Sequence, residues 1–172
     1  MKMMYLGGPG SGKSTHSKYI SKHFDIPHIY PGDMLRKSDD SEVKKLLAKG
    51  EFAPLDVVVK LIKQEIAKAP NGYILDGFPR NLEQLKVMQD ASIEINRVIY
   101  LDVSVAEVIK RLTSRGRADD TPEIVKNRLK VYERETGPVV DYYKDKKEFH
   151  SINAEGDIAE NIAKKIIRDI EE

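Results

Sequence analysis

The sequence predicts an α/β fold built on a five-stranded parallel sheet flanked by helices. Short apolar runs alternate along the 172 residues with longer stretches of helical period, a pattern typical of repeated strand and helix units. Glycine, proline, aspartate or asparagine stands on at least one side of each apolar run and marks where it ends. The predicted strands comprise residues 3–6, 28–30, 73–75, 98–103 and 149–153.

Helical patterns fill the intervals between these strands. Two of them begin with N-terminal signals, since Thr121 stands before Pro122 and Asp157 stands before the last helix. The interval 32–68 contains helical patterns and no strand, so we expect a protruding helical insertion over residues 31–60. Ligands bind such sheets beyond the carboxyl ends of the strands, which is where this insertion would lie. The predicted helices comprise residues 13–23, 54–68, 81–89, 105–114, 122–135, 138–146 and 158–170.

Length and composition indicate one compact domain over residues 1–172. A chain of this size buries roughly 70% of the surface that its unfolded form exposes, which suffices for one core. The 29 basic residues balance 28 acidic ones, so no global field favours nucleic acid and we expect none as a partner. No apolar run approaches the ~20 residues of a membrane span, so we expect no membrane association and a cytoplasmic location. The absence of cysteine excludes disulfides and thiolate catalysis.

A glycine-rich loop after the first predicted strand carries the strongest chemical signal. Residues 7–15 satisfy the pattern G-x-x-x-x-G-K-[ST] between a strand and a helix, which is the context that the motif requires. Its backbone N–H groups point into one concavity beside the positive end of the following helix, where phosphate binds. The pattern predicts a P-loop nucleoside triphosphate hydrolase-like fold. The expected ATP contacts in the loop are Gly8, Pro9, Gly10, Ser11, Gly12, Lys13, Ser14 and Thr15.

The loop also has a lysine and two hydroxyl side chains that can contact phosphate or its metal ion. Lys13 would reach the β- and γ-phosphates, and the hydroxyl of Ser14 or Thr15 would face the phosphates or the Mg²⁺ that they hold. The loop does not identify the acceptor, because GTPases, shikimate kinases and motor ATPases share it. A GTPase is disfavoured because the sequence lacks an Asn-Lys-x-Asp guanine reader. A kinase for a non-nucleotide small molecule would keep the loop and differ in the segments that follow.

Two further segments at strand ends combine an acid, a glycine and an arginine. They read Pro31-Gly32-Asp33-Met34-Leu35-Arg36 and Leu75-Asp76-Gly77-Phe78-Pro79-Arg80. With the glycine-rich loop, they make the chain resemble the adenylate kinase group of nucleoside monophosphate kinases over essentially its whole length. The resemblance implies an enzyme that transfers a phosphoryl group reversibly from MgATP to a nucleoside monophosphate, with AMP as the expected acceptor.

Arginines dominate the roles that the resemblance implies. A guanidinium binds two phosphate oxygens at once, and the loose transition state spreads charge over several oxygens. By similarity, Arg36 and Arg80 hold the acceptor's α-phosphate and Arg111 lies against the donor base. Asp76 would position Mg²⁺ through water, together with Ser14, and Asp33 would support that network from outside. The expected catalytic residues are Lys13, Arg80, Arg115, Arg117 and Arg128.

Two positions give conflicting indications of which nucleoside monophosphate is the acceptor. Gln84 matches the position whose amide reads the adenine of AMP in the family. Pro31 stands where AMP-specific members place a hydroxyl, and proline has neither hydroxyl nor N–H. We expect AMP preference with some leakage, and a UMP/CMP-type or broad-specificity kinase stays open. The expected AMP contacts are Pro31, Gly32, Arg36, Ala53, Gly77, Phe78, Arg80, Gln84, Arg117 and Arg128.

Two short segments would complete the nucleotide sites. Residues 115–120 resemble the family's lid reduced to its two ends. We therefore expect weak closure over the nucleotides, or help from a neighbouring subunit. The sequence is compatible with a monomer or a small homo-oligomer. Residues 153–158 resemble the loop that holds the ATP base by backbone groups, which predicts a tolerant donor site. Its expected ATP contacts are Gly156, Asp157 and Ile158, with Arg111 and Arg115 from outside the loop. The four histidines lack metal-ligand spacing, and we expect surface or packing roles for them.

Overall fold

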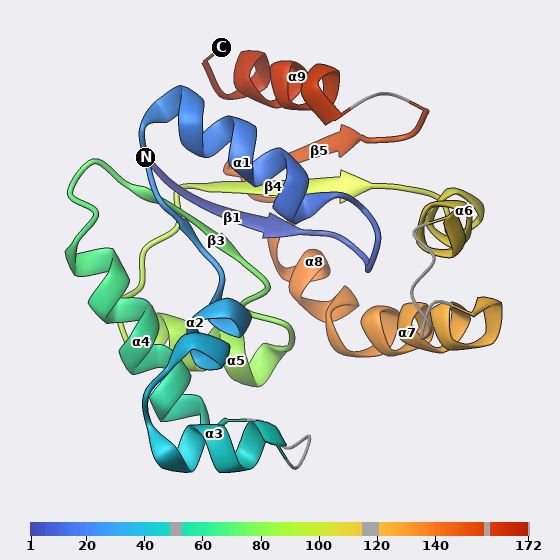
Figure 1. Cartoon of the computed structure of the whole chain (residues 1–172). Coiled ribbons are helices and arrows are strands. Elements are labelled where there is room, and N and C mark those ends of the chain that lie inside the picture. Colours follow the sequence, from blue (N-terminus) through green and yellow to red (C-terminus); the bar gives the residue numbers. More distant parts are fainter. Residues whose placement is uncertain (49–52, 115–120, 157–158, 172) are drawn as a thin grey trace.

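The computed structural model describes residues 1–48, 53–114, 121–156 and 159–171 (Figure 1). Its five strands form one parallel sheet in the order β2-β3-β1-β4-β5. The predicted sheet is confirmed, and the ends of each strand lie within one residue of the expected ones. The strands are β1 (Lys2–Leu6), β2 (His28–Ile29), β3 (Tyr73–Asp76), β4 (Arg97–Asp102) and β5 (Phe149–Asn153).

The described part of the chain contains nine helices. They are α1 (Lys13–Phe24), α2 (Pro31–Lys37), α3 (Ser41–Ala48), α4 (Leu55–Ala67), α5 (Leu82–Asp90), α6 (Val105–Ser114), α7 (Pro122–Glu135), α8 (Gly137–Tyr143) and α9 (Ala159–Glu171). The prediction of a helix over 138–146 was wrong at its end, because α8 stops at Tyr143. There the backbone turns back toward β5, as Lys146 N–H donates to Tyr143 C=O and Phe149 N–H donates to Lys146 C=O.

Helices cover both faces of the sheet, and β1 shows how the sequence produces this arrangement. Successive side chains of a strand point to opposite faces. Met4 and Leu6 therefore pack in the core beneath α4, α5 and α8, whereas Met3 and Tyr5 pack in the core beneath α1 and α9. Figure 1 shows these two helical layers on opposite sides of the sheet. A sheet buried on both faces is what an all-parallel strand order requires.

The chain between β2 and β3 forms α2, α3 and α4, with α3 farthest from the sheet (Figure 1). The expectation of helices without a strand holds for the described residues of this interval. Met34 and Leu55 pack against the edge of the core, so α2 and the start of α4 are attached to the sheet. A role of this insertion in binding an acceptor stays a prediction.

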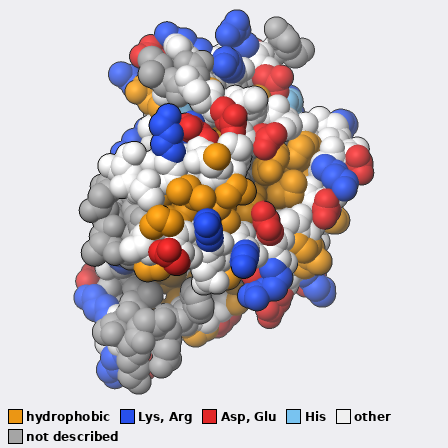
Figure 2. Space-filling view, turned by 90° about the vertical axis from the view of Figure 1, so that its right-hand side faces the viewer, with side chains coloured by type: hydrophobic (Ala, Val, Ile, Leu, Met, Phe, Trp, Pro, Cys, Tyr) orange, Lys and Arg blue, Asp and Glu red, His pale blue; other side chains and the backbone are white. Residues whose placement is uncertain are grey.

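Helices α6 and α7 lie side by side beyond the carboxyl ends of β1 and β4 (Figure 1). Val108 and Leu112 of α6 pack against Val125 and Leu129 of α7 in a separate small core. Figure 2 views the molecule from this side and shows basic and acidic side chains interspersed around a group of hydrophobic ones. Attraction of phosphate must therefore come from the local placement of cations. None of the helices in the described ranges is long and apolar enough to cross a membrane.

Candidate active site

The glycine-rich loop connects the end of β1 to the first turn of α1, and its glycines are required by both backbone and packing. Gly10 has φ +76° and Gly12 has φ +95°, in the left-handed region that disfavours other residues. A Cβ at Gly10 would lie 2.8 Å from Leu112 Cγ, and one at Gly12 would lie 2.7 Å from His16 Nε2. The loop is thus wedged between α6 and α1, with its N–H groups beside the positive end of α1.

Lys13 reaches across the concavity of this loop. Its Nζ donates to Gly7 C=O at 2.7 Å and to Gly8 C=O at 3.0 Å. Burial lowers the pKa of Lys13, and the negative charge of Asp76 opposes that shift. The ammonium group is therefore held where phosphate oxygens would replace the two carbonyl groups as its acceptors.

Asp76 ends β3 and is joined to the loop. Its side chain is 1% exposed, and its Oδ2 accepts a hydrogen bond from Ser14 Oγ at 2.8 Å. The Nε2 of His28 lies 3.1 Å from the same oxygen. Burial by itself would raise the pKa of Asp76, but the hydrogen bond from His28, the charge of Lys13 and the bond from Ser14 together hold that pKa below its usual value. Asp76 is therefore a buried carboxylate that is compensated by three neighbours.

His28 also belongs to the site, although the sequence analysis did not select it. The register of β2 and β3 pairs His28 with Ile74, so His28 shares a sheet face with the residue two positions further along β3. That residue is Asp76. The expectation of a surface or packing role for His28 was wrong in this respect, since the contact depends on a strand pairing that residue spacing does not reveal.

Arg80 joins three elements immediately after β3. Its Nε donates to Gly77 C=O at 2.9 Å, and its backbone N–H donates to Gln84 Oε1 at 2.7 Å. Its carbonyl accepts a hydrogen bond from Thr136 Oγ1, between α7 and α8, at 2.7 Å. The electrostatic contact of Arg80 with Lys13 further lowers the pKa of the lysine. The guanidinium of Arg80 and the ammonium of Lys13 thus act on the same region.

Tyr30 lies where the two acid-glycine-arginine segments meet. A Cβ at Gly32 would lie 3.1 Å from Tyr30 Cζ, and one at Gly77 would lie 2.9 Å from Tyr30 Cε2. The guanidinium carbon of Arg36 lies 5.7 Å from the centre of the same ring, and Arg36 forms an ion pair with Asp33 at 2.5 Å. The hydrogen bond from Arg36 lowers the pKa of Asp33. Sequence reasoning did not select Tyr30, because a single aromatic residue at a strand end carries no motif.

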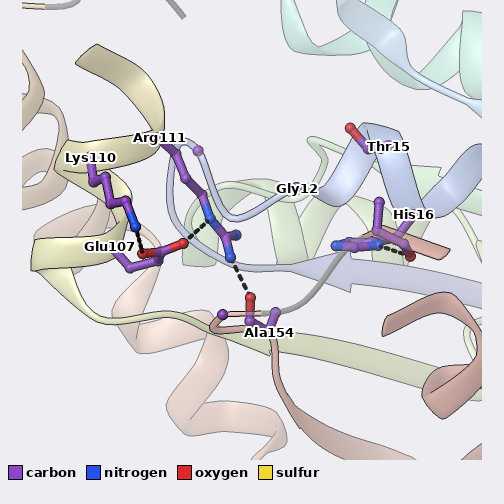
Figure 3. A pocket seen from close by; sticks show the side chains of 10 residues that line it. Gly12, Thr15, His16, Glu107, Lys110, Arg111 and Ala154 are labelled. Carbon is purple, nitrogen blue, oxygen red and sulfur yellow. Dashed lines mark hydrogen bonds and ion pairs between the residues drawn. The ribbon is translucent and has the colours of Figure 1, made fainter. Parts of the chain in front are cut away.

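A cavity of about 390 Å³ lies between the loop, α6 and the beginning of α9 (Figure 3). Arg111 forms one wall, with its Nε donating to Glu107 Oε1 at 2.8 Å and its Nη2 donating to Ala154 C=O at 2.5 Å. These two bonds fix the plane of the guanidinium, whose flat face suits stacking with a base. The cavity is lined by Gly10, Gly12, Thr15, His16, Glu107, Lys110, Arg111, Ala154, Gly156 and Ala159. Sequence reasoning selected Gly10, Gly12, Thr15, Arg111 and Gly156 as single ATP contacts and included Ala154 in the loop of residues 153–158. It missed His16, Glu107, Lys110 and Ala159.

Several other predicted site residues lie in the described part of the chain, and four lie outside it. Phe78 is buried in the hydrophobic core, so its backbone alone is available to a ligand. Pro31 is buried in the first turn of α2, Ala53 precedes α4, and Arg128 lies partly exposed on α7. Arg115, Arg117, Asp157 and Ile158 lie outside the described residues.

Comparison with known proteins identifies the family that this architecture represents. The family model described as adenylate kinase matches residues 5–148, most of the chain. The chain belongs to the adenylate kinase family. The adenylate kinase of Prochlorococcus marinus (strain MIT 9515) is 39% identical over 166 residues, which cover 91% of each chain. The adenylate kinase of Rhodococcus erythropolis (strain PR4 / NBRC 100887) is 37% identical, over 93% of this chain and 94% of that protein. Adenylate kinase 1 of Nostoc sp. (strain PCC 7120 / SAG 25.82 / UTEX 2576) is 36% identical over 90% of each chain.

Membership of the adenylate kinase family agrees with the topology of the site. The loop after β1, the carboxylate at the end of β3 and the arginine after it come together in one place, through the Ser14–Asp76 hydrogen bond and the proximity of Lys13 to Arg80. The expected resemblance over essentially the whole chain is thereby confirmed.

Proposed function

We propose that the protein catalyses reversible transfer of the γ-phosphoryl group of ATP to AMP, which yields two molecules of ADP. The observation that carries this proposal is the hydrogen bond between Ser14 and Asp76, 2.8 Å long. It joins the phosphate-binding loop to the segment that ends in Arg80, so one centre has both a donor side and an acceptor side. Membership of the adenylate kinase family supports the same reaction, as do the names of the relatives.

Mg²⁺ is the metal that such chemistry uses, and the residues at the end of β3 fit it. Magnesium prefers oxygen ligands and keeps several waters, so one carboxylate and the substrate phosphates suffice to hold it. Asp76 and Ser14 supply a carboxylate and a hydroxyl oxygen side by side. Within the described ranges, no group of three or more His, Asp or Glu side chains could hold a metal ion. When bound, the ion would neutralise charge on the phosphate oxygens.

The protein's own groups divide the work of phosphoryl transfer. Backbone N–H groups of the loop and the Nζ of Lys13 hold the donor phosphates in line, and Arg111 orients the donor base. Arg80 and Arg36 hold the acceptor phosphate by paired hydrogen bonds, and Arg128 adds charge from α7. Because phosphoryl transfer needs little covalent chemistry from the protein, positioning and charge stabilisation account for the catalysis.

The acceptor base would be read beside α5. Gln84 Oε1 already accepts a hydrogen bond from the backbone N–H of Arg80, and its amide NH₂ lies on the same side chain. A carbonyl oxygen has two lone pairs, so it can accept a second hydrogen bond from the amino group of adenine while the NH₂ donates to the ring. The bond to Arg80 would hold this amide in a fixed orientation. This arrangement supports AMP as the acceptor.

ADP formation tests the proposal directly. Purified protein is supplied with MgATP and, in turn, AMP, UMP, CMP or GMP, and ADP is measured by chromatography. We expect rapid ADP formation with AMP and slower formation with the others. Lys13→Ala should abolish it, whereas Lys18→Ala, an exposed lysine on the same helix, should not. ADP formation that does not depend on any monophosphate would contradict the proposal, and faster turnover with UMP or CMP would assign another acceptor.

A further inference from the structure

We propose that His16 recognises the sugar of the donor nucleotide, with its Nε2 accepting a hydrogen bond from a ribose hydroxyl of ATP. The inference rests on the proposed function, since it takes ATP as the donor in the cavity of Figure 3. It adds a contact to the ribose, for which the sequence predicts no partner. The expected side-chain contacts are to the phosphates and the base, and residues 153–158 are expected to hold the base by backbone groups.

The surroundings of His16 determine which ring nitrogen carries the proton. Its Nδ1 lies 3.1 Å from Ala159 C=O, and a carbonyl oxygen accepts hydrogen bonds only, so Nδ1 must be the donor. The side chain is 3% exposed, and burial lowers its pKa, which keeps the ring neutral near pH 7. In a neutral ring with a proton on Nδ1, Nε2 carries a lone pair. Nε2 is therefore a hydrogen-bond acceptor.

This acceptor faces the cavity. Figure 3 shows one ring nitrogen of His16 bonded to Ala159 and the other directed toward the side of the cavity that Arg111 forms. A Cβ at Gly12 would lie 2.7 Å from Nε2, so this atom is adjacent to Gly12 of the phosphate-binding loop. Within the part of the chain that the structure describes, Ala159 is the hydrogen-bond partner of the ring and Nε2 has none. Because His16 lines the cavity, this acceptor can take a hydrogen bond from a donor on a bound ligand.

The position of Nε2 along the cavity selects the sugar as its partner. Phosphates bind to the N–H groups of the loop, and the flat guanidinium of Arg111 lies across the cavity where a base would stack. The ribose lies between these two parts of a nucleotide. Ribose presents hydroxyl donors there, whereas the phosphate oxygens are acceptors and would repel a lone pair. The chemistry that matches His16 is therefore an O–H group next to the α-phosphate.

Donor analogues that lack one hydroxyl test the assignment. The kcat/KM of the wild-type protein is measured with saturating AMP and with ATP, 2′-deoxy-ATP or 3′-deoxy-ATP as donor. We expect one of the two deoxy donors to be poorer than ATP by about threefold to tenfold, the range that one hydrogen bond supplies. The comparison also shows whether the 2′- or the 3′-hydroxyl makes the contact.

Two substitutions of His16 separate recognition from packing. His16→Leu fills the space without an acceptor and should remove the preference for ATP over that deoxy donor. His16→Gln places an amide oxygen near the position of Nε2 and should restore much of it. Thermal unfolding of both variants checks that they fold, and calorimetric titration with ADP and the matching deoxy-ADP gives the same comparison without turnover. Loss of ADP formation by the wild-type protein would defeat the proposed function, whereas the titration still decides the role of His16.

Three outcomes would overturn the inference. The first is a His16→Leu protein that keeps the wild-type preference between ATP and its deoxy analogues, and the second is one that weakens all three donors equally. The third is a change in the ratio of kcat/KM for ATP to that for GTP with the deoxy comparison unchanged, which would assign Nε2 to the base. An independent check is the ¹⁵N shift of His16 Nε2 in NMR spectra, which should move on binding ADP and move less on binding the deoxy analogue that is the poorer ligand.

Discussion

The close contact between Gly10 and Leu112 leads to a quantitative prediction for Gly10→Ala. The loop residue has φ +76°, and a Cβ there would lie 2.8, 3.1 and 3.2 Å from three carbon atoms of the Leu112 side chain. Leu112 is 3% exposed in the small core between α6 and α7, so it has little room to withdraw. Both the backbone and the packing should therefore resist the methyl group.

The two costs of Gly10→Ala can be separated. The left-handed conformation costs a residue with a Cβ about 1–2 kcal/mol. Overpacking by one methyl in a tight site costs about 1–3 kcal/mol. Together they predict a loss of about 2–5 kcal/mol in the free energy of unfolding, a large part of the stability of a small domain. Because the strain lies in the phosphate-binding loop, the KM for ATP should rise as well.

Urea unfolding of matched variants measures this loss. Gly137→Ala is the control, since a Cβ at Gly137 in the first turn of α8 meets nothing within 4 Å, and it should be neutral or slightly stabilising. A double-mutant cycle of Gly10→Ala with Leu112→Ala should show less than additive destabilisation, by about 1 kcal/mol or more, because the smaller side chain removes the clash. An additive cycle, or a Gly10→Ala protein as stable as the wild type, would refute the steric argument.

Three further changes test other contacts. Replacing His28 by Leu removes the hydrogen bond to the buried Asp76 carboxylate and should cost about 2 kcal/mol in urea unfolding, whereas His28→Gln, which keeps a donor, should cost clearly less. Replacing Thr136 by Val removes the donor to the Arg80 carbonyl and should lower stability by about 1 kcal/mol; an unchanged melting curve would show that the hydroxyl contributes nothing. Burial raises the pKa of Tyr73 to about 12, whereas an unfolded tyrosine titrates near pH 10. The unfolded state therefore loses its proton first, so stability should fall by up to about 3 kcal/mol between pH 10 and 12, and Tyr73→Phe should reduce that fall.

Local signals in the sequence predicted most of the fold. Each strand was an apolar run with turn residues beside it, and the start of α7 was found because Thr121 caps the helix by accepting a hydrogen bond from the N–H of Ile124. The loop of residues 7–15 was recognisable because its chemistry depends on the spacing of adjacent residues. The end of α8 was missed, since the turn after Tyr143 is set by where the chain must enter β5 rather than by helix propensity.

The contacts that the sequence did not reveal share one physical origin. His28 reaches Asp76 through the register of two parallel strands, and His16 is oriented by the carbonyl of Ala159, which is 143 positions away. Neither histidine belongs to a motif, because the neighbours that define its role come from elsewhere in the chain. Sequence patterns indicate contacts within one helix, strand or loop, whereas the contacts of His28 and His16 depend on how separate elements pack together.

The end of β3 explains why the donor and acceptor sides of the site form one unit. Asp76 is bonded to the phosphate-binding loop through Ser14, Gly77 leaves space for Tyr30, and Arg80 is bonded to the segment between α7 and α8. Each contact uses a different atom of a five-residue stretch, so no residue there can shift without disturbing at least one neighbouring element. These contacts therefore hold residues 76–80 in one conformation. A segment so constrained holds the carboxylate and the arginine at a fixed separation, which phosphoryl transfer between two bound nucleotides requires.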